Sequence, residues 1–130
     1  MNGLTANHAM VVLRVTLCAL VFIHGVWRAT QGGVEPFGVW LNSKGFMIGP
    51  VIAWSITVFE LIGAPALAFG FQRKILATIF AAIYATGLVL VHMPAGWFVV
   101  GAGRNGMEYS VLLIIGFLLV GWTGTRRRGL

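Results

Sequence analysis

Glu60 is the residue whose type and position most clearly suggest chemistry. It lies near the middle of Pro50–Phe69, an apolar stretch of about the ~20 residues that a helix needs to cross a bilayer. An ionised carboxylate at that depth is costly, so we expect Glu60 to face the protein interior and to have a partner or a proton. Ala53, Thr57 and Gly63 lie on the same helical face and are small, which favours close packing of a neighbouring helix. Glu60 is therefore either a structural carboxylate that locks helices together or a group with a direct role in proton or ligand chemistry.

Arg14 is the basic residue that we expect to balance Glu60. It lies in the inner half of the first apolar stretch, about residues 9–27. If the first two stretches are antiparallel neighbours, Arg14 sits about four residues, or ~6 Å, inward of Glu60, which an extended arginine can cover. We predict a buried Arg14–Glu60 charge pair. The alternative is that Arg14 extends its side chain to the cytoplasmic head groups.

A second set of polar residues gathers near the outer ends of the predicted spans. His24 and Arg28 lie one helical turn apart on the first stretch. His92 closes the third stretch and Glu108 opens the fourth. We expect them to form the rim of an outward-facing polar pocket that meets a quinone head group or a small reductant. For Glu108 the alternative role is a capping charge, because a carboxylate at a helix N-terminus is favoured by the helix dipole.

Metal binding is a weaker hypothesis for the same residues. His24 and His92 could ligate haem or, with Met93 and Glu108, copper or another metal. The sequence contains no H-x-x-x-H pair, and its single cysteine, Cys18, lies inside an apolar stretch. These observations do not support haem or copper, and a polar pocket for a quinone head group or a small reductant is equally compatible with the same residues.

The segment Gly101–Gly106 matches the letters G-x-G-x-x-G. This motif indicates dinucleotide binding only where it follows a strand and opens a helix. Here it joins two apolar stretches, so we predict a tight turn that positions Arg104 and Glu108 and binds no dinucleotide.

Composition indicates that all these residues lie in a membrane protein. The chain has 130 residues, of which 58% are hydrophobic and 9% charged, and its mean hydropathy is +0.91. The net charge of +6 comes from basic residues at the ends of the apolar stretches. No basic face with interleaved aromatic residues is present, which argues against a nucleic-acid partner. The first stretch is too long for a signal peptide, so we expect it to be retained.

The apolar stretches predict an all-α, membrane-embedded four-helix bundle in a single domain. The expected spans are residues 9–27, 50–69, 75–93 and 107–122. The turn at Arg73 and Lys74 and the tail Arg126–Arg128 fall on one side, which the positive-inside rule makes cytoplasmic. We therefore expect both termini in the cytoplasm. Between the first two spans, Glu35–Lys44 is predicted to form a short interfacial helix that opens at Pro36.

The chain resembles the DoxX family of small four-helix membrane proteins over nearly its whole length. The segments that carry the resemblance are Arg14 ahead of His24-Gly25, Arg28, Gly49-Pro50, Phe59–Gly63 (FELIG), Arg73-Lys74, His92–Phe98 (HMPAGWF) and Gly106–Tyr109 (GMEY). Members often have lysine where this chain has Arg28, and the charge is kept. The resemblance implies a link to membrane oxidoreductase systems, including thiosulfate and quinone chemistry and oxidative-stress complexes. The polar positions that recur in the family map onto Arg14, His24, Arg28, Glu60, His92 and Glu108, and no cofactor is implied.

The combined pattern favours a subunit or accessory component of a quinone-linked redox or respiratory system in the bacterial cytoplasmic membrane. Its partners would be the bilayer and other subunits of such a complex. One alternative is a structural or assembly subunit whose buried charges only hold helices together. Another is a small transporter that uses Glu60 as a proton carrier, although no inverted repeat is visible.

Overall fold

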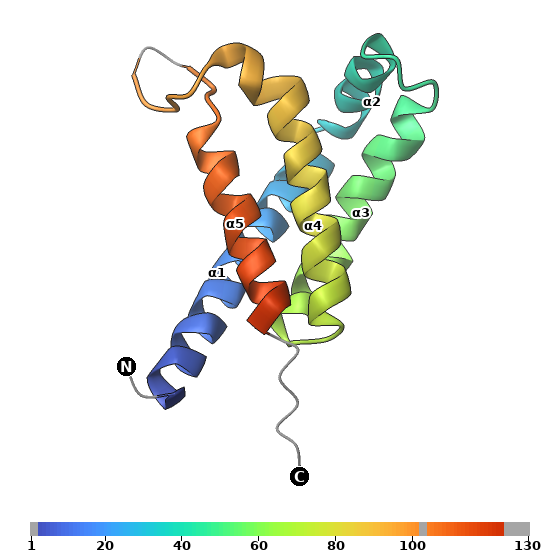
Figure 1. Ribbon diagram of the computed structural model, residues 1–130. Helices are drawn as coiled ribbons and strands as arrows, with labels where there is room; N and C mark the ends of the chain where they lie inside the picture. Colours follow the sequence, from blue (N-terminus) through green and yellow to red (C-terminus); the bar gives the residue numbers. More distant parts are fainter. Residues whose placement is uncertain (1–2, 102–103, 124–130) are drawn as a thin grey trace. The chain divides into compact units, whose positions relative to one another are not determined.

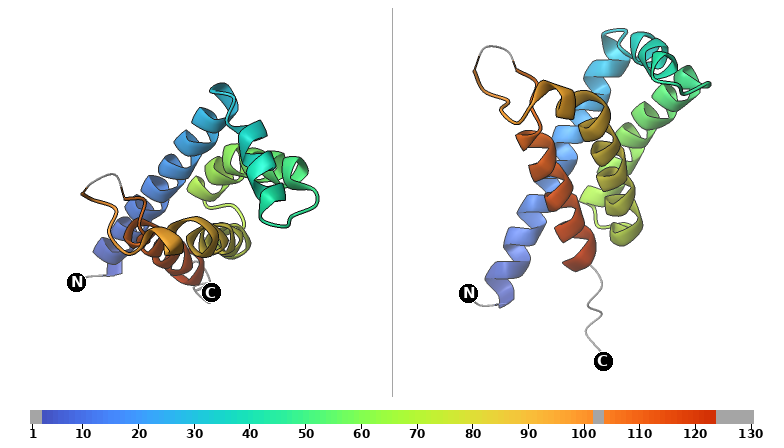
Figure 2. Two further views of the ribbon diagram at one scale, coloured as in Figure 1. Left: turned by 90° about the horizontal axis from the view of Figure 1, so that it is seen from above. Right: turned by 45° about the horizontal axis from the view of Figure 1, so that its top comes forward.

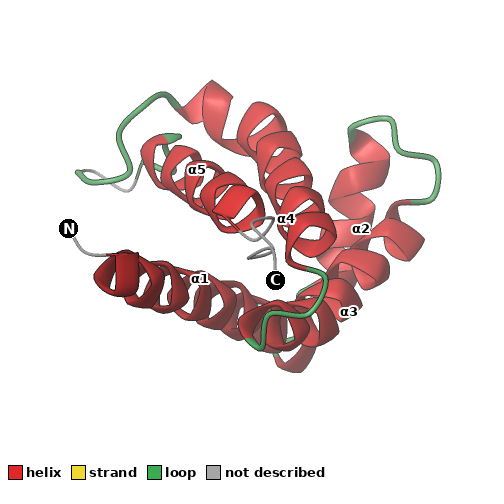
Figure 3. Cartoon of the chain, turned by 60° about the horizontal axis from the view of Figure 1, so that its bottom comes forward, coloured by secondary structure: helices red, strands yellow, loops and turns green. Residues whose placement is uncertain are grey.

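The structure is a computed structural model and describes residues 3–101 and 104–123. In these residues all the regular structure is helical (Figure 3). In chain order the helices are α1 (Gly3–Thr30), α2 (Val34–Ser43), α3 (Gly49–Ala68), α4 (Arg73–Gly87), the π-helical segment η1 (Leu88–His92), the 3₁₀ turn η2 (Met93–Ala95) and α5 (Glu108–Thr123). The predicted all-α class is confirmed. The arginine tail at 126–128 lies outside the described residues, as do positions 102 and 103 of the glycine-rich loop.

Three helical stretches are long and apolar enough to cross a membrane: Thr5–Thr30, Gly49–Ala68 and Arg73–Ala95. The fourth apolar helix, α5, has 16 residues and a length of about 24 Å. That is somewhat short of the ~30 Å thickness of a bilayer's hydrocarbon core. The described residues therefore support a multi-pass membrane protein with three candidate spans, and the fourth span stays a prediction.

The predicted helix between the first two spans is present as α2. It runs from Val34 to Ser43, close to the expected Glu35–Lys44, and Pro36 lies in its first turn. Proline is tolerated there because the first N–H groups of a helix have no partner within the helix. The sequence signal for this element is thus confirmed to within one residue at each end.

The chain divides into two compact units, which are described separately. One unit is Cys18–Phe71, which contains the last part of α1 together with α2 and α3. The other unit contains the residues up to Leu17 and those from Gln72 onward, including α4 and α5. Helix α1 thus contributes residues to both. Each of the predicted polar residues belongs to one or the other unit.

In the unit Cys18–Phe71, α2 folds back against the start of α3 (Figure 2). The two helices share a core of Val34, Leu41 and Ala53, with Phe37 and Trp40 packed against it. Their backbones come close where Gly38 faces Pro50, since a Cβ at Gly38 would lie 2.7 Å from the Pro50 Cα. The side chain of Asn42 accepts a hydrogen bond from the Gly49 N–H at 2.7 Å, which satisfies a donor in the first turn of α3.

In the other unit, α4 and α5 lie antiparallel and side by side (Figure 1). Their contact is built on stacked aromatic rings, with the Phe80 and Phe117 centroids 5.0 Å apart. Gly121 allows close approach to Ala77, where an added Cβ would lie 3.3 Å from the alanine Cβ. Small residues and aromatic stacking thus replace the hydrophobic effect, which does not drive helices together in lipid.

Candidate functional site

A buried ion pair joins α1 to α3 within the unit Cys18–Phe71. The Arg28 Nη1 atom is 2.8 Å from the Glu60 Oε2 atom, and the Glu60 side chain is only 1% exposed. The same nitrogen also donates a hydrogen bond of 3.2 Å to the Thr57 hydroxyl. That hydroxyl donates in turn to the Ala53 carbonyl at 2.8 Å. The expectation that Glu60 faces the protein interior and has a partner is therefore met by Arg28.

The pairing differs from the sequence-based expectation, which placed Arg28 on the outer rim and Arg14 on Glu60. Side chains on a helix lean toward its N-terminus. Arg28, near the end of α1, therefore reaches back along the helix to Glu60. Arg14 belongs to the other compact unit, so the Arg14–Glu60 pair stays a prediction.

Gly25 makes room for the Glu60 side chain on α1. A Cβ at this position would lie 2.9 Å from the Glu60 Cβ and 3.2 Å from its Oε2 atom. Distances below about 3.0 Å between such atoms require one of them to move, and the Glu60 Cβ is fixed on the α3 backbone. Gly25 thus allows α1 and α3 to approach closely enough for the Arg28–Glu60 pair to form.

We expect Gly25→Ala to destabilise the protein by about 1–3 kcal/mol, the usual cost of adding an atom to a well-packed core. The matched control is Gly87→Ala, because a Cβ there meets nothing within 4 Å and the backbone is helical. The control should be neutral or slightly stabilising, since alanine forms helices better than glycine. Thermal melting in detergent compares the two variants, and equal melting temperatures would contradict the proposed contact.

The guanidinium of Arg28 is also held by its surroundings on α2. Its Cζ atom lies 4.9 Å from the centre of the Phe37 ring, a cation–π contact. The Arg28 carbonyl accepts a hydrogen bond of 2.9 Å from the Gly33 N–H, which fixes the turn between α1 and α2. The Arg28 side chain is 12% exposed, so it is less completely buried than the carboxylate that it holds.

Two more of the predicted site residues, His92 and Glu108, lie at the ends of the connection between α4 and α5. The His92 Nδ1 atom is 2.9 Å from the Asn105 carbonyl oxygen. The Glu108 carboxylate accepts a hydrogen bond of 2.9 Å from the Val99 N–H, and the Glu108 N–H donates to the Trp97 carbonyl at 3.1 Å. These contacts hold the loop against the start of α5. Glu108 is also the first residue of α5, the position for which a capping charge was weighed in the sequence. His92 itself ends the π-helical segment, an irregularity that is frequent at functional sites.

The predicted rim residues are thus distributed over both units. His24 lies in the same unit as Arg28 but is exposed, and His92, Arg104 and Glu108 belong to the other unit. Their convergence on one outer pocket stays a prediction. Among the described residues no group of three or more histidine, cysteine, aspartate or glutamate side chains is arranged to hold a metal ion.

Sequence reasoning missed three residues that build the site: Gly25, Phe37 and the hydroxyl of Thr57. Thr57 was noticed only as a small residue on the Glu60 face. The signal for Gly25 was its position three residues before Arg28 on one helical face, where a glycine next to a charged residue indicates close packing. No sequence signal connected Phe37 to Arg28.

The residues of this ion pair fall inside a family match. The profile of the DoxX family matches residues 9–93, which include Arg28 and Glu60 and end before Glu108. The chain belongs to the DoxX family. This DoxX chain is also 26% identical over 117 residues to "Putative oxidoreductase CatD" of Bacillus subtilis (strain 168), an alignment that covers 88% of the chain and 78% of that protein. No solved structure matches the chain.

Proposed function

We propose that the chain is a quinone-linked component of a membrane redox system and that Arg28, Thr57 and Glu60 form its ligand site. The observation that carries this proposal is the buried Arg28–Glu60 pair, 2.8 Å long, in which the arginine side chain is 12% and the glutamate side chain 1% exposed. A charge pair inside a membrane helix bundle is costly to build and marks functional sites by default. The name of the Bacillus subtilis relative and the family's membrane character support a redox role.

The site has the groups that a quinone head group needs. A guanidinium carries five N–H donors in a planar fork, and only the Nη1 atom is used in the hydrogen bonds to Thr57 and Glu60. In the proposal, one of the other N–H groups donates to a quinone carbonyl oxygen. In the proposal, Glu60 accepts one of the two protons that a quinol releases when its two electrons pass to another subunit, and the second proton leaves to water.

The proposal includes the membrane arrangement predicted from the sequence. In it α5 completes a fourth span, both termini are cytoplasmic, and the membrane is the bacterial cytoplasmic membrane. Three candidate spans support this arrangement, together with the apolar character of α5. The basic residues Arg73 and Lys74 at the start of α4 favour a cytoplasmic position for that turn.

Binding of a short-chain quinone to the protein in nanodiscs tests the proposal. Tryptophan quenching should show saturable binding to the wild type. Arg28→Lys should weaken it by about tenfold, because lysine keeps the charge but lacks the planar fork. The double variant Arg28→Leu/Glu60→Leu removes both charges while keeping a bundle that can fold. It should not bind, and Lys44→Ala, which alters an exposed residue on Trp40, should bind normally.

A structural or assembly subunit is the second candidate, and the close approach of α1 and α3 at Gly25 favours it. Among the described residues every buried polar side-chain atom has a hydrogen-bond partner, as a purely structural site would require. If the double variant folds and binds quinone as the wild type does, the charge pair is not the ligand site. The structural role is then the better description.

A further inference from the structure

The surface of α2 carries a groove that the Arg28–Glu60 site does not use. Two adjoining hollows of about 450 and 460 Å³ share Gly32, Glu35 and Val39 in their walls. Both volumes fall within the range of roughly 300–1,000 Å³ that is typical of small-molecule sites. The two hollows adjoin along α2 and are together called the groove below; the second also borders the end of α1 and the start of α3.

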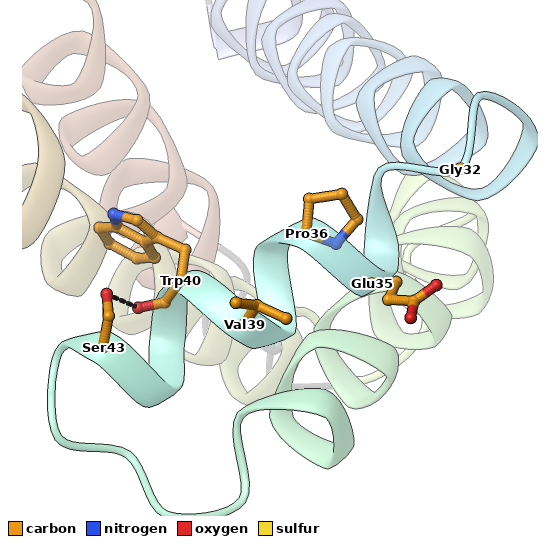
Figure 4. A pocket seen from close by; sticks show the side chains of 6 residues that line it. All are labelled: Gly32, Glu35, Pro36, Val39, Trp40 and Ser43. Atoms are coloured by element: carbon orange, nitrogen blue, oxygen red, sulfur yellow. Dashed lines mark hydrogen bonds between the residues drawn. The ribbon is translucent and has the colours of Figure 1, made fainter.

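The walls of this groove are mainly apolar. Pro36, Val39 and Trp40 line the first hollow, and Figure 4 shows the Glu35 carboxylate and the Trp40 ring toward its opposite ends. Pro50 and Trp54, from the first turns of α3, line the second hollow. Tryptophan and proline side chains in this arrangement present a flat apolar wall to a long, thin ligand.

The groove has one charged group. Glu35 is the only charged side chain in the wall of either hollow, and it is exposed. Among the described residues Glu35 has no ion-pair partner, because Arg28 turns to Glu60 and Lys44 stacks on Trp40 at 5.7 Å. A lone carboxylate in an apolar wall selects a ligand with a cation at one end and apolar groups beside it.

The position of α2 indicates which such ligand is at hand. α2 joins α1 to α3, and both of these contain candidate membrane spans. If α1 and α3 span the bilayer, their connection lies at the membrane surface, where phospholipid head groups are found and where tryptophan is enriched. An amphiphile of the membrane itself meets the groove with its charged head beside its apolar chains.

We propose that the groove binds a phospholipid whose head group carries a primary ammonium, namely phosphatidylethanolamine. The ammonium donates hydrogen bonds to the Glu35 carboxylate, and the glycerol and upper acyl chains lie against Val39 and Trp54. A phosphatidylglycerol head group has no cation for Glu35. A phosphatidylcholine head group has a cation but no N–H donor. This site is separate from the quinone site proposed above and does not depend on it.

Native mass spectrometry of the delipidated full-length protein with added lipid tests this proposal. The wild type should retain phosphatidylethanolamine about two- to fivefold better than phosphatidylcholine or phosphatidylglycerol, as expected for one partly exposed ion pair. Glu35→Gln should remove this preference. Glu35→Lys should reverse it in favour of phosphatidylglycerol. Thr86→Ala, which alters an exposed, uncharged residue of α4 that lines neither hollow, should behave as the wild type does.

Two results would overturn the proposal. One is an unchanged preference for phosphatidylethanolamine in both Glu35 variants, which would place the lipid elsewhere. The other is equal retention of all three lipids by the wild type. Both Glu35 variants should fold, because Glu35 is exposed and has no ion-pair partner in the described residues. Val39→Trp tests the groove independently, because it fills the groove and keeps the carboxylate. It should lower retention of phosphatidylethanolamine.

Discussion

Removing either member of the Arg28–Glu60 pair should destabilise the protein by ~3–5 kcal/mol, whereas removing both should cost far less. Each single change leaves one charge buried without its partner, and Glu60 is 1% exposed. The double variant Arg28→Leu/Glu60→Leu leaves two apolar side chains that can pack against each other. This is the largest effect that we expect from substitutions in the chain.

The two single variants should differ in severity. In Arg28→Leu the stranded Glu60 can become neutral by taking up a proton. In Glu60→Leu the stranded Arg28 stays charged, because arginine does not lose its proton in proteins. Its remaining partners are the Thr57 hydroxyl and the Phe37 ring, which are neutral. We therefore expect Glu60→Leu to be the harsher change.

A double-mutant cycle on melting in nanodiscs measures the coupling between the two residues. The same cycle on Arg14 and Glu60 is the matched comparison, because it tests the pair predicted from sequence with the same acid. We expect the Arg28 cycle to show the larger coupling energy. Strict additivity of Arg28→Leu and Glu60→Leu would mean that the pair does not stabilise the fold, and a larger coupling for Arg14 would make Arg14 the main partner of Glu60.

Gly49→Ala is expected to destabilise the protein by about 3 kcal/mol or more, at the upper end of the cost of overpacking. A Cβ at Gly49 would collide with the Gly38 carbonyl oxygen and lie 2.6 Å from the Asn42 Oδ1 atom. The carbonyl belongs to the α2 backbone, so the clash cannot be relieved by turning a side chain. The whole of α2 would have to move away from α3.

The contribution of packing can be separated from that of the hydrogen bond at the same place. Asn42→Ala removes the acceptor of the Gly49 N–H without adding an atom, and it should cost only about 0.5–1.5 kcal/mol. Gly87→Ala again serves as the open-site control. The loss of melting temperature should be largest for Gly49→Ala, smaller for Asn42→Ala and smallest for Gly87→Ala. A Gly49→Ala variant as stable as Asn42→Ala would show that α2 and α3 are not in close contact.

This hairpin also matters for the ion pair. Phe37, which lies next to Gly38 on α2, supports the Arg28 guanidinium through the contact of 4.9 Å. A shift of α2 caused by Gly49→Ala should therefore weaken quinone binding as well as stability, if the proposed site is right. The close packing of Gly38 and Gly49 in the α2–α3 hairpin thus helps to position the Arg28 guanidinium on α1.

Much of the fold could be predicted from the sequence because the membrane allows few solutions. Backbone polar groups in lipid must bond within their own segment, so long apolar stretches become helices. This rule predicted α1, α3 and α4 from hydropathy, and the proline near its start marked α2. The interior position of Glu60 followed in the same way, because a charge in the middle of an apolar helix must turn away from lipid.

The partner of Glu60 was decided only by the tertiary structure. Arg28 is 32 residues away in the chain, and its pairing depends on the direction in which its side chain leans and on the space that Gly25 leaves. The sequence determined which charge had to be neutralised. Three-dimensional packing determined which residue neutralises it. The reach of a side chain, its direction and the distance between two helices depend on how the helices are placed against each other. The spacing of residues along one helix does not encode them.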